Sequence, residues 1–101
     1  MTTRLGRRAL AGLARTGSSM SDGSGDFVIV FSSVPVSRRS SLPQVPHDGL
    51  SPIFQATIEA TEEALYNSMF MATTVRGRRG TVTELPVDST LTILRKHAVI
   101  R

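Results

Sequence analysis

The sequence predicts an α/β fold made of a helix, one buried strand, a long helix and a short C-terminal helix. Apolar residues recur with helical periodicity at the start and in the middle of the chain. Between them lies FVIVFSS, a run of apolar, β-branched and aromatic residues that suits a strand covered on both faces. The 101 residues suffice for one domain but not for two, so we expect one partial domain over residues 1–101.

The first predicted helix lies in MTTRLGRRALAGLARTGSS. At 100° per residue, one side carries the arginines Arg4, Arg7, Arg8 and Arg15, and the other carries Leu5, Ala9, Leu10 and Leu13. We expect the arginine side to be solvated and Gly17 to end the helix. An arginine-rich, acid-free N-terminus followed by serines is also typical of a mitochondrial transit peptide, so an imported protein with a cleaved leader is an alternative.

The predicted strand, Phe27–Ser33, has no partner of comparable quality in the chain. The nearest candidate is the shorter run TVTEL, Thr81–Leu85. A strand of the buried type needs neighbours, because both its faces and its backbone groups must be covered. The sequence therefore calls for a sheet that it does not itself contain.

The rest of the chain reads as loop, long helix, turn and short helix. Residues 34–50 are predicted to form an irregular Pro/Ser-rich loop. Ser51 and Pro52 suit the start of a long helix, RGRRG suits a tight basic turn, and LPVDSTLTILRKH suits a closing helix. One stripe of the long helix carries Ile53, Phe54, Thr57, Ile58, Thr61, Leu65 and Met69, and the other side carries Glu59, Glu62, Glu63 and Tyr66.

Composition excludes several classes of function. Cysteine is absent, which excludes disulfides, thiolate catalysis and cysteine-bound metal and gives no sign of an oxidising compartment. No apolar stretch approaches the roughly 18 residues of a membrane span, and we expect a cytoplasmic protein. The formal net charge of +4 steers weakly toward anions, but the aromatic residues lie away from the arginine clusters, so no specific nucleic acid is expected.

The candidate site is the loop SDGSGDF. A phosphate loop would follow a strand and carry a lysine, whereas this loop precedes a strand and has none. Ser24 and Asp26 are two residues apart, so they can project to one side as the chain becomes extended. A hydroxyl and a carboxylate on one side can hold and relay a proton for a third group. The alternative is a plain turn in which Asp26 caps backbone N–H groups.

Other motifs are weaker. RGRRG could bind phosphate and SRRSS could be phosphorylated, but both are more typical of solvated loops. His47 and His97 lie far apart without companions, so no metal or other cofactor is predicted. The methionines Met20, Met69 and Met71 are interpreted as packing residues.

Taken in order, these segments resemble the C-terminal part of the L-aminopeptidase/D-esterase family, which includes the β-aminopeptidases. The motifs that carry the resemblance are GLARTGS, GSGDFVIVFS, ATEEALYNS and LPVDSTLTILRK, in collinear order over almost the whole chain. The resemblance implies a fragment of a layered α/β sandwich similar to the N-terminal-nucleophile hydrolases. It also implies that Ser24 and Asp26 are auxiliary catalytic residues, which orient and activate a nucleophilic serine.

The resemblance covers only the C-terminal part of the small subunit. Nothing before Arg4 matches the strand that begins with the nucleophile, and Thr2 runs into a helix instead. The expected function is therefore that of an aminopeptidase-family hydrolase, acting through a serine acyl-enzyme, of which this chain alone is inactive. The expected partners are the missing N-terminal subunit or upstream segment, a peptide or amino-acid amide substrate, and further copies in a homo-oligomer. The alternative is a small basic interaction domain that binds nucleic acid or a protein.

Overall fold

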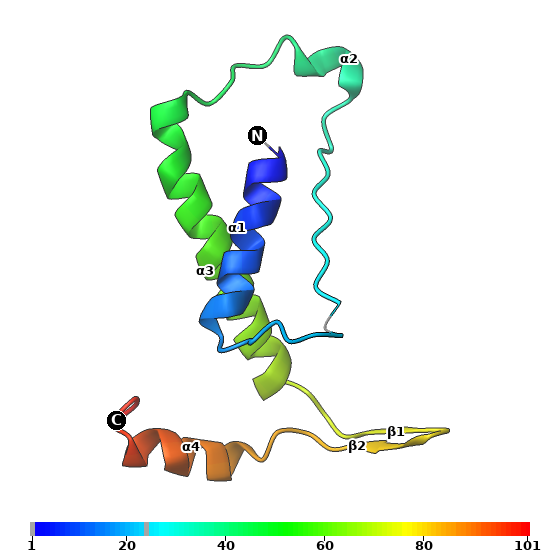
Figure 1. Cartoon of the computed structure of the whole chain (residues 1–101), viewed down its shortest axis with the longest axis vertical. Coiled ribbons are helices and arrows are strands. Elements are labelled where there is room, and N and C mark those ends of the chain that lie inside the picture. The colour runs from blue at the N-terminus through cyan, green and yellow to red at the C-terminus, as the bar shows by residue number, and fades with distance from the viewer. Residues whose placement is uncertain (1, 24) are drawn as a thin grey trace. The chain divides into compact units, whose positions relative to one another are not determined.

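The computed structural model describes residues 2–23 and 25–101. It contains helices and one two-stranded antiparallel sheet (Figure 1), which confirms a small α/β structure. The chain divides into two compact units, Met1–Leu65 and Tyr66–Arg101. The prediction of a single partial domain stays a prediction. The elements of the described residues are α1 (Thr2–Arg15), α2 (Val36–Arg39), η1 (His47–Gly49), α3 (Leu50–Phe70), β1 (Val75–Gly77), β2 (Gly80–Val82) and α4 (Val87–Lys96).

Helix α1 ends as the sequence predicts. Gly17 has a φ of +91°, a left-handed conformation that glycine adopts without strain and that commonly ends a helix. Just before it, the Thr16 backbone N–H and hydroxyl both donate to the Leu13 carbonyl, at 3.2 and 2.7 Å. These bonds satisfy a carbonyl that the helix itself leaves without a partner.

The first unit is held together by the contact between α1 and α3. The buried apolar residues of the described chain, Leu50 and Phe54, both lie in the first turns of α3. Gly12 of α1 is buried, and a Cβ atom built on it would stand 2.6 Å from the Ile58 carbonyl oxygen and 2.8 Å from Cβ of Thr61. The two helices therefore touch through their backbones at this point.

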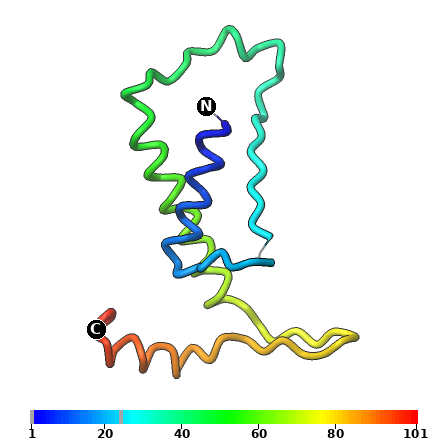
Figure 2. The backbone as a smooth tube through the Cα atoms, in the orientation of Figure 1, coloured from blue at the N-terminus to red at the C-terminus, as the bar shows by residue number. Residues whose placement is uncertain are grey.

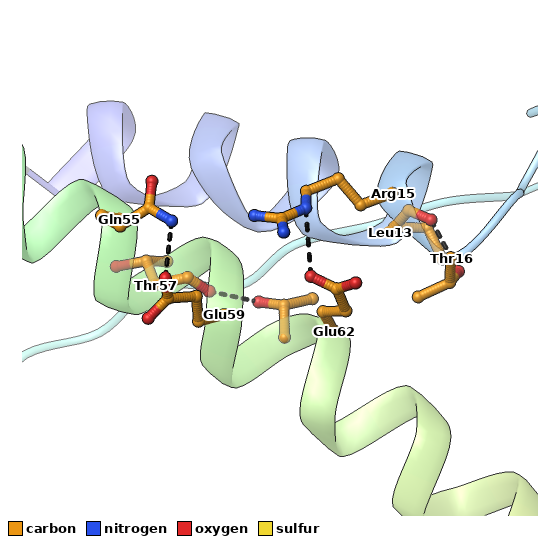
Figure 3. A network of polar contacts seen from close by, with 8 residues as sticks. Leu13, Arg15, Thr16, Gln55, Thr57, Glu59 and Glu62 are labelled. Carbon is orange, nitrogen blue, oxygen red and sulfur yellow. Dashed lines mark hydrogen bonds and ion pairs between the residues drawn. The ribbon is translucent and has the colours of Figure 1, made fainter. Parts of the chain in front are cut away.

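The arginine side of α1 is exposed at Arg4, Arg7 and Arg15, as expected, and half-buried at Arg8. Three of these arginines also contact α3, which the sequence did not predict. The Arg4 and Arg8 guanidinium carbons lie 4.9 and 4.8 Å from the centroid of the Phe54 ring. Arg15 Nε lies 3.1 Å from Glu62 Oε2, as Figure 3 shows, so Glu62 faces α1 as well. The apolar stem of an arginine can pack on a neighbouring helix while its charged head stays in water. Helical periodicity alone does not predict such a contact.

The rest of the predicted stripe on α3 is partly confirmed. Side chains from Ile53 to Leu65 on this stripe are buried or half-buried, but Met69 is 43% exposed. Thr57 and Thr61 donate their hydroxyl hydrogens to the carbonyls one turn earlier, at 2.8 and 2.7 Å. Their hydroxyls are thereby satisfied inside a mainly apolar stripe.

Residues 27–33 are extended and run beside α1 (Figures 1 and 2). Val28 and Val30 face Gly6 of α1, where a built Cβ atom would lie 3.5 and 3.1 Å from their methyl groups. Phe27, Ile29 and Phe31 are 90%, 88% and 85% exposed. The predicted buried strand is therefore wrong for this chain by itself, because no described segment pairs with it or covers its outer side. Only the side toward α1 is partly covered.

The predicted irregular loop, residues 34–50, contains two short helices. Helix α2 spans Val36–Arg39 and the 3₁₀ helix η1 spans His47–Gly49. The long helix begins at Leu50 directly after η1, one residue before the predicted cap, Ser51. A proline, Pro35 or Pro46, stands directly before each short helix, where its fixed φ suits a helix start. The prolines of this segment are therefore as compatible with short helices as with a loop.

The second unit contains a hairpin that the sequence predicted only as a turn. Val75 pairs with Val82 and Gly77 with Gly80, which leaves Arg78 and Arg79 at the tip and confirms the tight basic turn. At the base, the Thr74 N–H donates to Glu84 Oε2 at 3.0 Å, and the Glu84 N–H donates to the Thr74 hydroxyl at 3.1 Å. These reciprocal bonds extend the pairing beyond the strands. Helix α4 follows, starting at Val87.

Candidate functional site

The candidate site lies in the loop that leads from α1 to the extended segment. Asp22 and Gly23 form a turn, and Gly23 has a φ of +86°. A Cβ atom built on Gly23 would meet nothing within 4 Å, so glycine is required here by the backbone conformation and not by crowding. Met20 also adopts a positive φ, 45°, which is uncommon for a residue with a side chain. The described part of the loop thus contains two residues with left-handed backbone, Met20 and Gly23.

Asp26 stands where this loop becomes extended chain, and its residue is exposed. Alternation in an extended backbone assigns Asp26 to the same side as Val28 and Val30, which face α1. It therefore lies on the opposite side from Phe27 and Ile29. Ser24, the other predicted site residue, lies outside the described residues, so the structure does not test the pair.

Gly25, between the two predicted residues, is crowded by a ring. A Cβ atom built on it would stand 3.1 Å from Cε2 of Phe27, closer than most real contacts of this kind. The ring of Phe27 therefore lies across the Gly25 backbone. Absence of a side chain at this position lets the ring and the backbone approach one another just before Asp26.

Thr2, whose hydroxyl is the one nearest the start of the chain, is the first residue of α1 and lies far from Asp26. Helix α1 has 14 residues, and a helix of this length is about 21 Å long. The helix runs along the extended segment, with its N-terminus at the end remote from the glycine-rich loop (Figure 1). Asp26 cannot act on the Thr2 hydroxyl across this distance.

The described part of the loop carries two carboxylates, those of Asp22 and Asp26. A carboxylate at the start of an extended segment can accept, hold or orient a proton for a neighbouring group. Among residues 2–23 and 25–101, no three His, Asp or Glu side chains come together as metal ligands would. In the same part of the chain, no helix is both long and apolar enough to cross a membrane.

Sequence reasoning missed the two buried glycines of α1, Gly6 and Gly12. Six residues correspond to about 600° of helical rotation, so the two positions face directions about 120° apart. Gly6 receives Val28 and Val30 of the extended segment, and Gly12 receives α3. Small residues at this spacing were the available signal for a helix that contacts two neighbours.

Comparison with known proteins identifies the group to which this α/β chain belongs. The profile of Peptidase family S58 matches residues 1–83, most of the chain and all of the candidate loop. The fold and this match define the chain as a member of a hydrolase class, the peptidases. It belongs to peptidase family S58, which is the L-aminopeptidase/D-esterase family that the sequence resembles.

The similar proteins are much longer than this chain. A β-peptidyl aminopeptidase, BapA, of Sphingosinicella microcystinivorans is 39% identical over 93% of the chain, and BapA of Sphingosinicella xenopeptidilytica is 31% identical over 91%. The chain spans 26% and 25% of these two proteins. The crystal structure of the PH0078 protein from Pyrococcus horikoshii OT3 superposes with a TM-score of 0.72 and 31% identity, over 94% of this chain and 29% of that one.

Proposed function

We propose that this chain supplies the Ser24–Asp26 loop to a serine aminopeptidase that hydrolyses amides or esters at an amino-terminal residue. The observation that carries the proposal is the family match, which includes the loop. The names of the two relatives, both β-peptidyl aminopeptidases, support the substrate class. In this proposal the chain alone is inactive, because the nucleophile belongs to a segment outside it.

In the proposed reaction the nucleophilic serine lies at the new N-terminus of a cleaved precursor. Its Oγ attacks the substrate carbonyl, the Oγ proton passes to the leaving amine or alcohol, and an acyl-enzyme forms. Water then attacks the acyl-enzyme, releases the acid and returns a proton to Oγ. Asp26 and Ser24 act as positioning residues, which orient the nucleophile and favour loss of its proton.

The extended segment supports the proposed partner, the remaining N-terminal part of such an enzyme. Phe27, Ile29 and Phe31 offer three large apolar side chains on one side, each at least 85% exposed. The backbone of residues 27–33 joins no sheet among the described residues, and an unpaired edge of this kind recruits another strand. Pairing and coverage by an N-terminal part would complete a layered sandwich like that of the N-terminal-nucleophile hydrolases.

Co-expression with the corresponding N-terminal portion of a relative tests the proposal. The assay is hydrolysis of an amino-acid p-nitroanilide by the purified complex. We expect activity in the complex, none in the chain alone, and a loss of about 10²–10⁴ in kcat for Asp26→Asn. Asp22→Asn is the matched control, because Asp22 is an exposed aspartate in the same loop.

Two results separate the proposal from the reading of the loop as a turn. If Asp26→Asn keeps full activity in a folded complex, the carboxylate has no part in the reaction. If Asp22→Asn and Asp26→Asn lose activity equally, and the loss follows unfolding in a thermal melt, the loop is structural. The alternative of a basic interaction domain has less support, since Arg4, Arg8 and Arg15 contact α3.

A further inference from the structure

A pocket lies within the first unit, among α1, the end of α2 and the start of α3. Two cationic side chains and an imidazole, those of Arg4, Arg39 and His47, line it together with Gln44. In Figure 1 the α2 region and the glycine-rich loop lie at opposite ends of the extended segment, so this pocket is separate from the candidate catalytic loop. Neither the family match nor the similar proteins assign a role to it.

The basic groups of this pocket are held in place by contacts of their own. Arg4 is fixed on two sides, by the Phe54 ring at 4.9 Å and by His47, whose Nε2 lies 3.4 Å from Arg4 Nη1. Arg39 donates from Nε to the Val34 carbonyl at 3.2 Å, and that bond does not engage its Nη hydrogens. Arg4, Arg39 and His47 are all exposed, so their remaining polar atoms can be reached by a ligand.

The charge of the pocket is not balanced by its own lining. The described residues that line it include no aspartate or glutamate. Asp48, next to His47 in the chain, turns its Oδ1 toward the Gly49 N–H at 3.0 Å. Two guanidinium groups in a lining without a carboxylate attract an anion, and arginine pairs well with planar oxyanions.

The remaining lining is apolar and sets the second requirement on the ligand. Leu42, Pro43, Val45 and Leu50 contribute to the same pocket. Leu50 is 5% exposed and belongs to the core, whereas Leu42 and Val45 are 47% and 40% exposed and offer apolar surface to a ligand. An apolar wall beside fixed cations suits a molecule with a carboxylate at one end and an apolar body, more than a fully hydrated inorganic anion.

We propose that Arg4, Arg39 and His47 form a binding site for a small carboxylate with an apolar body. Arg4 and Arg39 donate to the two carboxylate oxygens and Gln44 donates at the rim. His47 accepts from Arg4 through Nε2, and the apolar body lies on Leu42 and Leu50. The site depends on the loop sequence between residues 34 and 50 and not on the catalytic loop. The proposed carboxylate site can therefore be confirmed or refuted independently of the peptidase activity.

Titration of the ¹⁵N-labelled chain with N-acetyl-L-leucine, followed by NMR, tests the site. We expect saturable shifts at the side chains of Arg4, Arg39 and His47, and an affinity about tenfold weaker in Arg39→Gln. Arg38→Gln is the matched control, because Arg38 is an exposed arginine of the same helix that does not line the pocket. Neither arginine takes part in the contacts between α1 and α3, so both variants keep the fold of the parent.

Three further probes decide which part of the ligand is recognised. N-acetyl-L-leucinamide has the same apolar body without the charge, and acetate has the charge without the body, so both should bind at least tenfold more weakly. Inorganic phosphate should bind no better than acetate. Equal binding of acid and amide, equal loss in Arg38→Gln and Arg39→Gln, or the absence of saturable shifts would overturn the proposal.

Discussion

Gly12 of α1 lies directly against the carbonyl of Ile58 on α3, and a Cβ atom at Gly12 would stand 2.6 Å from that oxygen. Real Cβ atoms do not approach backbone oxygens so closely, and the backbone of a helix cannot turn aside as a side chain can. This contact sets how closely the two helices approach in the first unit. The remaining contacts between them, from Phe54 to Glu62, depend on it.

Gly12→Ala should therefore destabilise the first unit although alanine favours helix. We expect the free energy of unfolding to fall by about 1–3 kcal/mol, because α1 and α3 must move apart. Gly6→Ala is the control: its Cβ would meet only methyl groups of Val28 and Val30, at 3.5 and 3.1 Å, so its effect should stay within about 1 kcal/mol. Urea unfolding followed by circular dichroism measures both. Equal stability of the two variants would contradict the close approach.

The ion pair between Arg15 and Glu62 should contribute little and should respond to salt. The Arg15 side chain is 50% exposed, so we expect a coupling of about 0.2–1 kcal/mol in a double-mutant cycle with Arg15→Gln and Glu62→Gln. The coupling should shrink at about 1 M salt, where screening is strong. Glu63 is the exposed neighbour of Glu62, and the control substitution Glu63→Gln should show no coupling to Arg15. A coupling that is unchanged by salt would mean that the pair is not mainly electrostatic.

The exposed side of residues 27–33 should make the isolated chain self-associate. Ile29→Ser removes an apolar side chain that is 88% exposed, so the average mass measured by light scattering should fall toward that of a monomer. Val36→Ser removes a similar side chain, 77% exposed, from α2 and should leave association unchanged. A parent chain that is monomeric with a sharp two-state melt would refute this expectation.

Ser24→Ala tests the hydroxyl of the proposed pair in the reconstituted complex. We expect lower activity, with a smaller loss than that of Asp26→Asn, because a water molecule can replace a hydroxyl in a hydrogen-bonded chain. Ser21→Ala, in the same loop, should keep the activity of the parent. If Ser24→Ala matches the parent in kcat and in KM, the serine does not position the nucleophile.

The sequence predicted elements well where their signals are local. The glycine stop at Gly17 and the long apolar stripe of α3 follow from conformational freedom and periodicity within one element. Contacts between elements were harder to predict. The contact of Arg8 with Phe54 was not predicted, because nothing in a single helix indicates that a ring 46 residues later will pack against it.

The candidate site could be predicted as a loop, but the arrangement of other groups around it could not. Alternation gave Asp26 its side of the extended segment, and the glycines on each side of Ser24 gave the turn. In the proposed function the group on which Asp26 acts belongs to another segment, so its position could not be predicted from these 101 residues. The pocket of Arg4, Arg39 and His47 was missed for the same reason, since its members come from three separate elements.

The reciprocal hydrogen bonds between Thr74 and Glu84 lie at the base of the hairpin, at the opposite end from its tip. Because the base is held by these bonds and by the Val75–Val82 pair, we expect substitutions of Arg78 and Arg79 to leave the base intact. The tip is accordingly a place where an epitope or a fluorescent label can be inserted with little disturbance of the fold. Such a label would report on assembly with a partner without occupying the candidate loop or the extended segment.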